Sequence, residues 1–252
     1  MSNIAVICRD PADSFARTLA DRLVLPLLAM SDALSSGCEF FLCQREGCLK
    51  LLDRQTLKKG GLFVEVDPRP GEQASYPAPK KDLLALAVGK KSRTIVDATA
   101  GWAQDSLAMF RMGYQVTSIE RSPVMAALIR DGFERLAQKD WVQRRKLEPP
   151  TLLVGNAIER LANLQEKPDC IYLDPMFPPK RKASAATRKS MAILRDILGD
   201  DLDRQVLFDA AIAATGRRVV VKSPDHAEPM GGKPSESYHG KLLRYDVYLT
   251  DT

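Results

Sequence analysis

The sequence predicts an α/β protein in which a doubly wound, mostly parallel sheet follows a small N-terminal α+β domain. Three observations support this fold class. From about residue 80 onward, short apolar strands alternate with helical segments. Before that point, several strand-like segments surround a single helix. Between the two regions, residues 67–79 form a proline-rich passage that suits a linker. We therefore expect one domain at 1–79 and a second at 80–252.

Length and composition agree with a globular protein. The 252 residues are 45% hydrophobic, enough for one large core or for a main domain with a small appendage. The net charge of +5 is compatible with an anionic partner, although a charge this small does not by itself indicate nucleic acid. The most apolar run, residues 23–30, is short and interrupted by Pro26. We expect a cytoplasmic protein without a membrane segment.

The five cysteines do not form a metal-binding pattern. No C-x-x-C pair is present, and the only histidines, His226 and His239, are far from the cysteines in sequence. Reduced thiols are the favoured interpretation, and no metal is predicted.

The N-terminal region contains one helix among strands. Ile4 to Cys8 is typical of a strand. Asp10 and Pro11 resemble an N-cap and the first helical residue of the helix that follows. Residues 40–44 and 48–52 form a hairpin candidate, and residues 62–66 alternate as a further strand.

The second region alternates between the two element types. The strands expected there are 94–98, 115–119, 151–154, 170–173, 218–222 and 243–249, the last of them antiparallel. The helices expected there are 81–88, 105–112, 123–138, 158–164, 188–198 and 202–214. Ser122 and Pro123 give the clearest helix start, because they combine an N-cap with proline at the first helical position.

The chain from Ile95 to Asp105 is the first candidate binding motif. A buried-looking strand leads into a small-residue turn at Gly101 and then into a helix. An ordinary strand-loop-helix connection and a cofactor-binding turn both fit this pattern. Ligands of doubly wound sheets lie beyond the carboxyl ends of the strands, so the residues at those ends are informative. They are Asp97, Glu120, Asn156 and Asp174.

The turn does not fit a dinucleotide. It has Gly101 but Ala103 two residues later, and no third glycine. Glu120 follows Gly101 by nineteen positions, close to the offset of roughly 20 residues at which an acidic side chain meets ribose hydroxyls. A ligand with a ribose, no phosphate and a positive charge suits a turn flanked by Asp97 and Asp105. S-adenosylmethionine (SAM) has these properties.

The sharpest motif is Asp174-Pro-Met-Phe-Pro-Pro179, directly after the expected strand 170–173. It resembles the Asp/Asn-Pro-Pro-Tyr/Phe loop of methyltransferases that modify exocyclic amines, with Met176 in place of the second proline. Such an amine shares its lone pair with the ring, so it needs acceptors that hold its protons. The Asp174 carboxylate and the Pro175 carbonyl are candidate acceptors, and Phe177 is a candidate for stacking on the base.

A basic segment follows this loop and is the candidate RNA-binding surface. Its residues are Lys180, Arg181, Lys182, Arg188 and Lys189. Lys222, at the end of the strand 218–222, lies at the same edge and is a candidate phosphate ligand. Other basic clusters are more simply explained as solvated faces. His226 and His239 are expected in a Gly/Pro-rich loop, as surface residues and not as catalytic bases.

Together these residues resemble the bacterial small-subunit (16S) ribosomal RNA methyltransferase J family. The matching segments are Asp97-Ala-Thr-Ala-Gly101, Glu120-Arg121, Tyr172-Leu-Asp-Pro-Met-Phe-Pro178 and Val219-Val-Val-Lys222. The resemblance implies a Rossmann-like SAM-dependent methyltransferase fold and methylation of the guanine at position 1516 of 16S RNA at N2. It implies cofactor contacts at Gln104, Asp105, Glu120, Arg121, Asn156, Ala157 and Asp174. Trp102-Ala-Gln-Asp105 stands where similar proteins tend to have Leu-Gly-Arg-Asp.

The favoured hypothesis is a SAM-dependent guanine-N2 methyltransferase that acts, as a monomer, on 16S ribosomal RNA or the small ribosomal subunit. A related enzyme acting on adenine N6 or on a different guanine is the nearest alternative. A nicotinamide oxidoreductase would need the phosphate-binding glycines that are missing. A non-enzymatic RNA-binding protein would use the basic surfaces alone, and residues 1–79 are a candidate RNA contact in either case.

Overall fold

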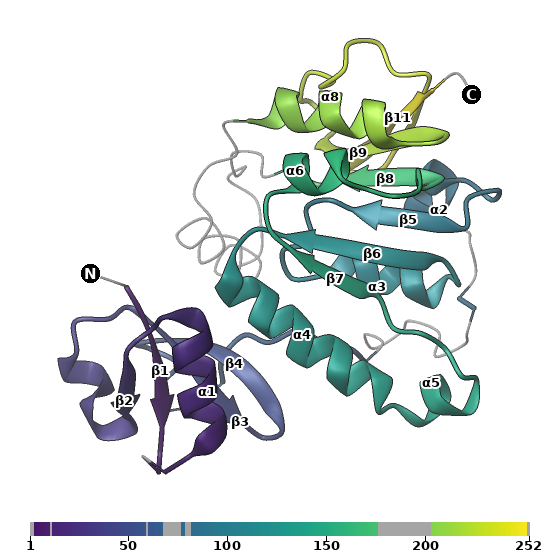
Figure 1. Cartoon of the computed structure of the whole chain (residues 1–252). Helices are drawn as coiled ribbons and strands as arrows, with labels where there is room; N and C mark the ends of the chain where they lie inside the picture. The colour runs from purple at the N-terminus through teal and green to yellow at the C-terminus, as the bar shows by residue number, and fades with distance from the viewer. Residues whose placement is uncertain are drawn as a thin grey trace.

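The computed structural model describes residues 3–10, 12–58, 60–67, 77–78, 82–175 and 203–250. Within these ranges the strands form two sheets, a four-stranded sheet of order β2-β1-β3-β4 and a seven-stranded sheet of order β10-β11-β9-β8-β5-β6-β7. Figure 1 shows the smaller sheet, in purple and dark blue, beside the larger one, with helix α4 between them. The predicted α/β fold class with a small α+β unit at the N-terminus is confirmed. The domain boundary at residue 79 stays a prediction.

The small sheet contains the predicted N-terminal strand and hairpin. Its strands are β1 (Ile4–Cys8), β2 (Leu27–Ala29), β3 (Phe40–Arg45) and β4 (Cys48–Asp53). β1 runs parallel to both of its neighbours, whereas β3 and β4 pair as an antiparallel hairpin. The hairpin turns at Glu46 and Gly47, which both have positive φ. Neither β2 nor the following 3-10 helix (Met30–Ser35) was predicted.

Helix α1 (Ser14–Leu23) begins later than predicted. Its N-cap is Asp13, whose Oδ1 accepts hydrogen bonds from the backbone N–H groups of Phe15 and Ala16. Asp10 instead accepts a bond from the Ala12 N–H, within the turn that precedes the helix. The prediction of Asp10 as N-cap was therefore wrong, because a second capping residue lies three positions further on.

The predicted strand at residues 62–66 is also wrong. Only Leu62 pairs with a strand, through an isolated antiparallel bridge to Leu51. The carbonyl oxygens of Val64 and Val66 accept hydrogen bonds from the side chains of Arg135 and Arg111 instead. Beyond the bridge at Leu62, this segment is therefore held by arginine side chains of the second region.

The large sheet follows the predicted order of elements closely. Its parallel strands are β5 (Thr94–Asp97), β6 (Gln115–Glu120), β7 (Thr151–Val154), β8 (Cys170–Leu173) and β9 (Arg218–Pro224). β11 (Leu243–Leu249) pairs antiparallel with β9, as expected. β10 (Glu236–His239) was not predicted, and it places His239 on a strand instead of in a loop.

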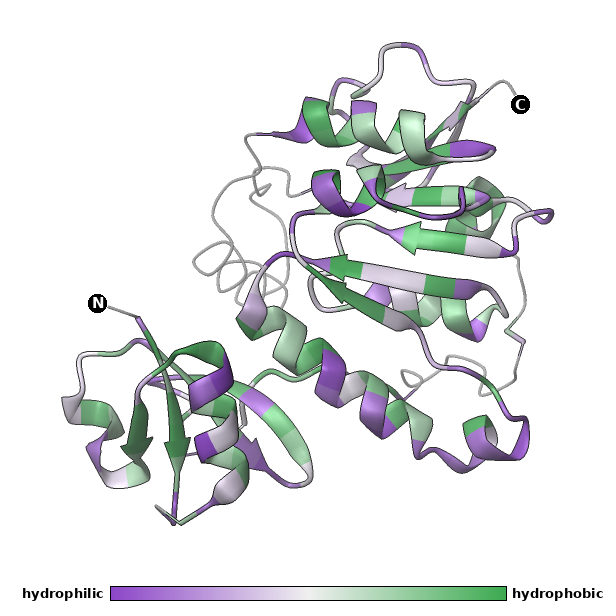
Figure 2. Cartoon of the chain, viewed as in Figure 1, coloured by the Kyte–Doolittle hydropathy of each residue, from purple (hydrophilic) through white to green (hydrophobic). Residues whose placement is uncertain are grey.

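Helices cover both faces of this sheet. The helices, in chain order, are α2 (Leu83–Val88), α3 (Gln104–Arg111), α4 (Pro123–Ala137), α5 (Asp140–Arg144), α6 (Ala157–Ala162) and α8 (Arg204–Ala214). Alternate strand residues face opposite apolar layers: Tyr172 packs with the layer of α2, α3 and α4, whereas Ile171 and Leu173 pack with the layer of α6 and α8. Figure 2 shows the middle strands as largely apolar. α5 was not predicted, and the expected helix 188–198 lies outside the described residues.

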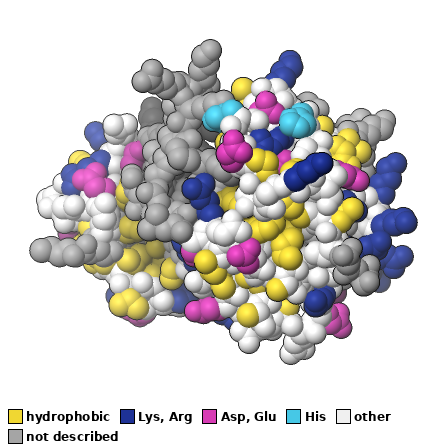
Figure 3. All heavy atoms as spheres, turned by 90° about the horizontal axis from the view of Figure 1, so that it is seen from above, with side chains coloured by type: hydrophobic (Ala, Val, Ile, Leu, Met, Phe, Trp, Pro, Cys, Tyr) yellow, Lys and Arg dark blue, Asp and Glu magenta, His cyan; other side chains and the backbone are white. Residues whose placement is uncertain are grey.

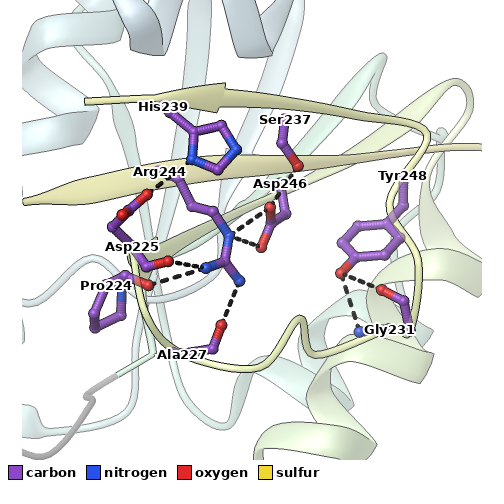
Figure 4. Close-up of polar contacts among 10 residues, drawn as sticks. Pro224, Asp225, Ala227, Gly231, Ser237, His239, Arg244, Asp246 and Tyr248 are labelled. Atoms are coloured by element: carbon purple, nitrogen blue, oxygen red, sulfur yellow. Dashed lines mark hydrogen bonds and ion pairs between the residues drawn. The ribbon is translucent and has the colours of Figure 1, made fainter. Parts of the chain in front are cut away.

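A buried arginine fastens the chain that follows β9. The Arg244 guanidinium, on β11, pairs with the buried Asp246 carboxylate and donates to the carbonyl oxygens of Pro224, Asp225 and Ala227 (Figure 4). Arg244 is 5% exposed and Asp246 is fully buried. A buried charge of this kind is stable only when it is paired and hydrogen bonded, as it is here.

The two histidines lie at the surface, as predicted, near the chain that follows β9. His226 and His239 are both exposed, and Figure 3 shows two histidine side chains, in cyan, on the face seen from above. His239 Nδ1 lies 2.8 Å from the Asp225 carboxylate. Across the residues described, no helix is long and apolar enough to cross a membrane, and the five cysteines are free thiols.

The N-terminal unit packs directly on helix α4. The Leu49 N–H donates to the Asp131 carboxylate, and the Arg135 guanidinium donates to the Val64 carbonyl. Between these two bonds, Gly132 lies so close to Val64 that a Cβ at Gly132 would be 2.5 Å from a Val64 methyl carbon. The apolar core is continuous across this contact. A glycine in the helix therefore permits the close approach of the two units.

We predict that Gly132→Ala lowers the free energy of unfolding by ~1–2 kcal/mol. An alanine normally stabilises a helix interior by up to ~1 kcal/mol relative to glycine, but overpacking against the buried Val64 costs ~1–3 kcal/mol. Denaturant unfolding measures the change. In the Gly132→Ala/Val64→Ala double variant, the decrease in the free energy of unfolding should be smaller than the sum of the decreases in the two single variants. A more stable Gly132→Ala single variant would contradict the close packing.

Candidate active site

Four parallel strands bring the candidate residues to one edge of the sheet. β5 ends at Asp97, β6 ends at Glu120, and β8 ends one residue before Asp174. β7 ends at Val154, which pairs with Glu120, so the next residues lie at the same edge. The expectation that these strand ends meet is therefore confirmed. The individual roles of these residues stay predictions.

The turn between β5 and α3 is built around the carboxylate of Asp97, which is 1% exposed. Oδ1 accepts from the Thr99 N–H at 3.1 Å, and Oδ2 accepts from the Ser106 hydroxyl at 2.5 Å. Ser106 in turn accepts from the buried Ser118 hydroxyl of β6. Burial raises the pKa of Asp97 to about 7, although the Ser106 hydrogen bond opposes this shift.

Two residues of the turn have left-handed backbones. Gly101 has a φ of 51° and Ala103, the N-cap of α3, has a φ of 54°. Glycine adopts this conformation without cost, whereas alanine is strained by ~1–2 kcal/mol. Ala103 is fully buried, so the surrounding packing imposes its conformation.

Glu120 ties this turn to β6. Its Oε2 accepts from the Gly101 N–H at 3.0 Å, and its Oε1 accepts from the Ser122 N–H at 2.8 Å. Burial raises the pKa of Glu120, and these backbone hydrogen bonds act in the opposite direction. Both oxygens are therefore already oriented by the protein. The adjacent Arg121 is exposed.

The loop after β7 provides a further part of the edge. The Gly155 N–H donates to the Glu120 carbonyl, which keeps this loop beside the end of β6. Asn156 is the N-cap of α6, because its side-chain oxygen accepts from the Ile158 N–H at 2.9 Å. Ala157 is the first residue of the helix and is half-buried. Asn156 thus has a structural role in addition to any ligand contact.

An ammonium group joins the two halves of the site. Lys222 Nζ lies 2.8 Å from Asp174 Oδ2 and 2.8 Å from Asp105 Oδ2. Asp105 Oδ2 also accepts from the buried Tyr172 hydroxyl at 2.6 Å. Lys222, expected as a phosphate ligand, therefore has two carboxylates as partners in this structure. The sequence placed Lys222 at this edge but did not indicate these partners or the part played by Tyr172.

The electrostatics of this group favour a charged lysine. Burial lowers the pKa of Lys222, but Asp174 and Asp105 outweigh burial, so the pKa is raised overall. The pKa of the Tyr172 hydroxyl is also raised, mainly by burial and then by the neighbouring carboxylates. With one ammonium and two carboxylates, the group carries a net negative charge that suits a cationic ligand.

Gln104 and Asp105 line a cavity of about 340 Å³ at the start of α3. The other walls come from α2, from Tyr245 of β11, from Arg111 at the end of α3, and from Glu65 and Asp67 near the start of the predicted linker. Asp105 therefore lines the cavity and also lies at the carboxyl edge of the sheet, where it pairs with Lys222.

The acceptor loop is described only at its start. Pro175 is buried, and the Asp174 N–H donates to the Thr99 hydroxyl at 2.6 Å. Thr99 was not predicted as a site residue, although it belongs to the turn that the sequence singled out. The remaining predicted acceptor and RNA-binding residues lie outside the described residues: Phe177, Lys180, Arg181, Lys182, Arg188 and Lys189.

The side chains of this site fit SAM better than a dinucleotide. The turn has a single glycine, Gly101, and acidic side chains surround it instead of phosphate-binding groups. Glu120 offers an oriented carboxylate for ribose hydroxyls, and the net negative charge around Lys222 suits a sulfonium and an ammonium. No group of three metal-ligating side chains occurs among the residues that the structure describes.

The comparisons with known proteins agree with this site. A family model described as "Putative SAM-dependent methyltransferase" matches residues 27–250. A solved SAM-dependent methyltransferase from Neisseria gonorrhoeae is 29% identical, with a TM-score of 0.68 over 98% of this chain and 96% of that one. The fold and the site thus define a SAM-dependent methyltransferase.

Curated relatives identify the family. The ribosomal RNA small subunit methyltransferase J of Tolumonas auensis is 38% identical over 99% of both chains. The protein of the same name from Chromobacterium violaceum is 37% identical over 99% of this chain and 97% of its own. This chain belongs to the ribosomal RNA small subunit methyltransferase J family, as the resemblance implied.

We predict that Asp97 makes stability depend on pH. The carboxyl group titrates near its ordinary value of about 4 when unfolded but near 7 when folded. The folded state therefore binds the extra proton between these values, and its stability falls as pH rises from about 4 to 7. Relative to wild type, Asp97→Asn should gain stability over this range, by on the order of a few kcal/mol.

Denaturant unfolding at pH 4.5 and pH 8 tests this prediction. Asp140→Asn is the matched control, since Asp140 lies on the surface of α5 and its side chain is 82% exposed. If the difference in free energy of unfolding between Asp97→Asn and wild type were the same at the two pH values, the raised pKa of Asp97 would be refuted.

Proposed function

We propose that this protein transfers a methyl group from SAM to the exocyclic N2 of a guanine in 16S ribosomal RNA, at position 1516 as the family activity implies. The observation that carries the proposal is the placement of Asp174, with its acceptor-loop sequence, beside the Asp97–Asp105 turn. Family membership supports the ribosomal substrate. We further propose that the protein acts as a monomer in the cytoplasm, with residues 1–79 as an additional RNA contact.

The proposed cofactor site lies along the β5, β6 and β7 ends. Glu120 accepts hydrogen bonds from the ribose hydroxyls, and the residues around Gly101 form the wall against which the cofactor lies. Asp97 holds that wall in place from within the core. The further contacts are assigned to Gln104, Asp105, Arg121, Asn156, Ala157 and Asp174. When bound, SAM supplies a methyl group activated by a sulfonium.

The proposed catalytic residues act by positioning the amine. The N2 nitrogen donates one hydrogen bond to the Asp174 carboxylate and one to the Pro175 carbonyl, so its lone pair turns out of conjugation with the ring. Phe177 stacks on the base, a contact worth ~1–3 kcal/mol. The amine proton leaves to solvent after transfer. Alignment supplies most of the acceleration, and no covalent nucleophile is required.

The proposed RNA contacts are electrostatic. Lys180, Arg181, Lys182, Arg188 and Lys189 follow the acceptor loop in sequence, and we assign them to RNA phosphates near the target base for that reason. Lys222 was assigned to this group from its position at the end of β9. Its two carboxylate partners favour a different role, which is developed below.

Mass spectrometry of ribosomal RNA tests the function directly. RNA from a strain in which the gene is deleted should lack N2-methylguanine at position 1516, and purified protein with SAM should restore it. Restored methylation at adenine N6 or at another guanine would support the alternative methyltransferase activity. RNA binding without SAM binding would support the non-enzymatic alternative.

We predict that Asp174→Asn lowers the single-turnover rate of methylation by ~100-fold or more. The asparagine keeps the size of the side chain but replaces one acceptor oxygen by an amide NH₂ group. This group donates hydrogen bonds and cannot accept one from the guanine amine. Affinity for SAM should be retained or fall by less than the rate does, because Asp174 is one of several assigned cofactor contacts, and the melting temperature should stay near that of wild type. A wild-type rate in this variant would exclude Asp174 as the acceptor.

We predict that Glu120→Gln weakens SAM binding by ~10- to 100-fold, the effect of losing a charged hydrogen bond worth ~1.5–3 kcal/mol. Titration calorimetry measures the dissociation constant. Glu134→Gln is the matched control and should bind SAM as wild type does, because Glu134 is exposed on α4 and has no assigned contact, while Glu120 is 4% exposed. Unchanged SAM affinity in Glu120→Gln would refute the ribose assignment.

A further inference from the structure

Lys222 occupies an unusual position for a lysine at the edge of a sheet. It extends from β9 past the end of β8, and its ammonium meets carboxylates from the acceptor loop and from helix α3. Its side chain is only 22% exposed. A lysine in contact with RNA phosphates would direct its ammonium outward, whereas this ammonium is directed to two protein carboxylates.

Of the two carboxylates, Asp105 is fixed by the protein core. Its Oδ2 accepts a 2.6 Å hydrogen bond from the Tyr172 hydroxyl, and Tyr172 is fully buried in the middle of the sheet. Tyr172 also packs on Tyr245 of β11, in the same apolar layer of the sheet, with ring centroids 6.5 Å apart. Asp105 therefore provides a rigid reference point at the start of α3.

Asp174, in contrast, lies where the sheet gives way to a loop. Its backbone is held by the bond from its N–H to the Thr99 hydroxyl, while its carboxylate is held by Lys222. The Thr99 bond restrains the Asp174 backbone, and the Lys222 bond restrains its carboxylate. Without the ammonium, Asp105 and Asp174 would be neighbouring like charges that repel each other.

We propose that Lys222 is a positioning residue of the methyl transfer: it holds the Asp174 carboxylate against the rigid Asp105–Tyr172 pair, so that the amine acceptor keeps a fixed geometry relative to the cofactor turn. This inference rests on the proposed function of Asp174. It assigns Lys222 to the orientation of the acceptor instead of to the RNA backbone. A displacement of about 1 Å at such a site costs ~100-fold in rate.

The test is a comparison of Lys222→Met with wild type in single-turnover methylation. The methionine keeps the length of the side chain and removes the charge and the hydrogen bonds. We expect the rate constant to fall by ~10- to 100-fold, with the dissociation constant for RNA unchanged. Lys222→Arg, which restores a cation, should recover part of the rate.

Lys91→Met is the matched control. Lys91 is exposed and precedes β5, so it lies toward the opposite edge of the sheet. The Lys91→Met substitution removes the same charge from the chain, and the methylation rate of this variant should equal that of wild type. A melting curve for each variant separates loss of positioning from loss of folding, and Lys222→Gln, which keeps a donor without charge, is measured if the methionine variant unfolds.

A phosphate-binding role makes the opposite prediction. In that case Lys222→Met would weaken RNA binding, reduce the slope of log affinity against log salt by about 1, and leave the rate at saturating RNA unchanged. That result, or a wild-type rate in Lys222→Met, would overturn the proposal. Failure of the proposed function is distinct, because the wild-type protein itself would then produce no N2-methylguanine.

Discussion

The structure of the site depends on the buried carboxylate of Asp97. A carboxylate that is 1% exposed is costly to bury, and hydrogen bonds from Thr99 and Ser106 offset part of that cost. The same bonds determine the course of the chain from β5 into α3. Because the turn is fixed there, the Gly101 N–H can reach Glu120 and the Thr99 hydroxyl can reach Asp174. The hydrogen bonds of Asp97 inside the core thus help to place the turn beside both Glu120 and Asp174.

The strained backbone of Ala103 is a consequence of the same turn. The chain must adopt a left-handed conformation immediately before α3, and the sequence supplies alanine there instead of glycine. The Ala103 N–H bonds to the Ala100 carbonyl, and Ala103 itself is fully buried. The departure from the Leu-Gly-Arg-Asp pattern therefore affects backbone energy as well as the side chain at position 104. The geometry of the turn is kept because several neighbouring contacts determine it.

The sequence predicted the large sheet well because its strands are apolar and bounded by clear turn residues. Strands β7, β8 and β11 begin and end at the predicted residues. The errors have physical causes. β2 has only three residues and follows Pro26, and β10 lies in a stretch rich in glycine and proline, so neither has a detectable period. Residues 62–66 alternate like a strand, yet arginine side chains satisfy two of their carbonyls.

The candidate site was predictable as far as strand ends determine it. Asp97, Glu120 and Asp174 follow from the rule that parallel strands present their carboxyl ends at one edge. The pairing of Lys222 with Asp105 does not follow, because the two residues are 117 positions apart and their contact depends on side-chain reach across β8. Tyr172 could have been suspected, since it is a hydroxyl-bearing residue inside an otherwise apolar strand, and a buried hydroxyl requires a partner.

The last strands explain how Lys222 can serve as a fixed support. Lys222 pairs with Tyr245 of β11, and Arg244, the preceding residue of β11, binds the carbonyl oxygens of Pro224 and Asp225. The chain on the far side of Lys222 is therefore held by a buried guanidinium (Figure 4). A lysine on a free strand end would move with its carboxylate partners. β9 is paired with β8 up to Val221 and is tied to Arg244 after Lys222, so the ammonium has a fixed base from which to restrain Asp174, and the antiparallel end of the sheet contributes to the site through this support.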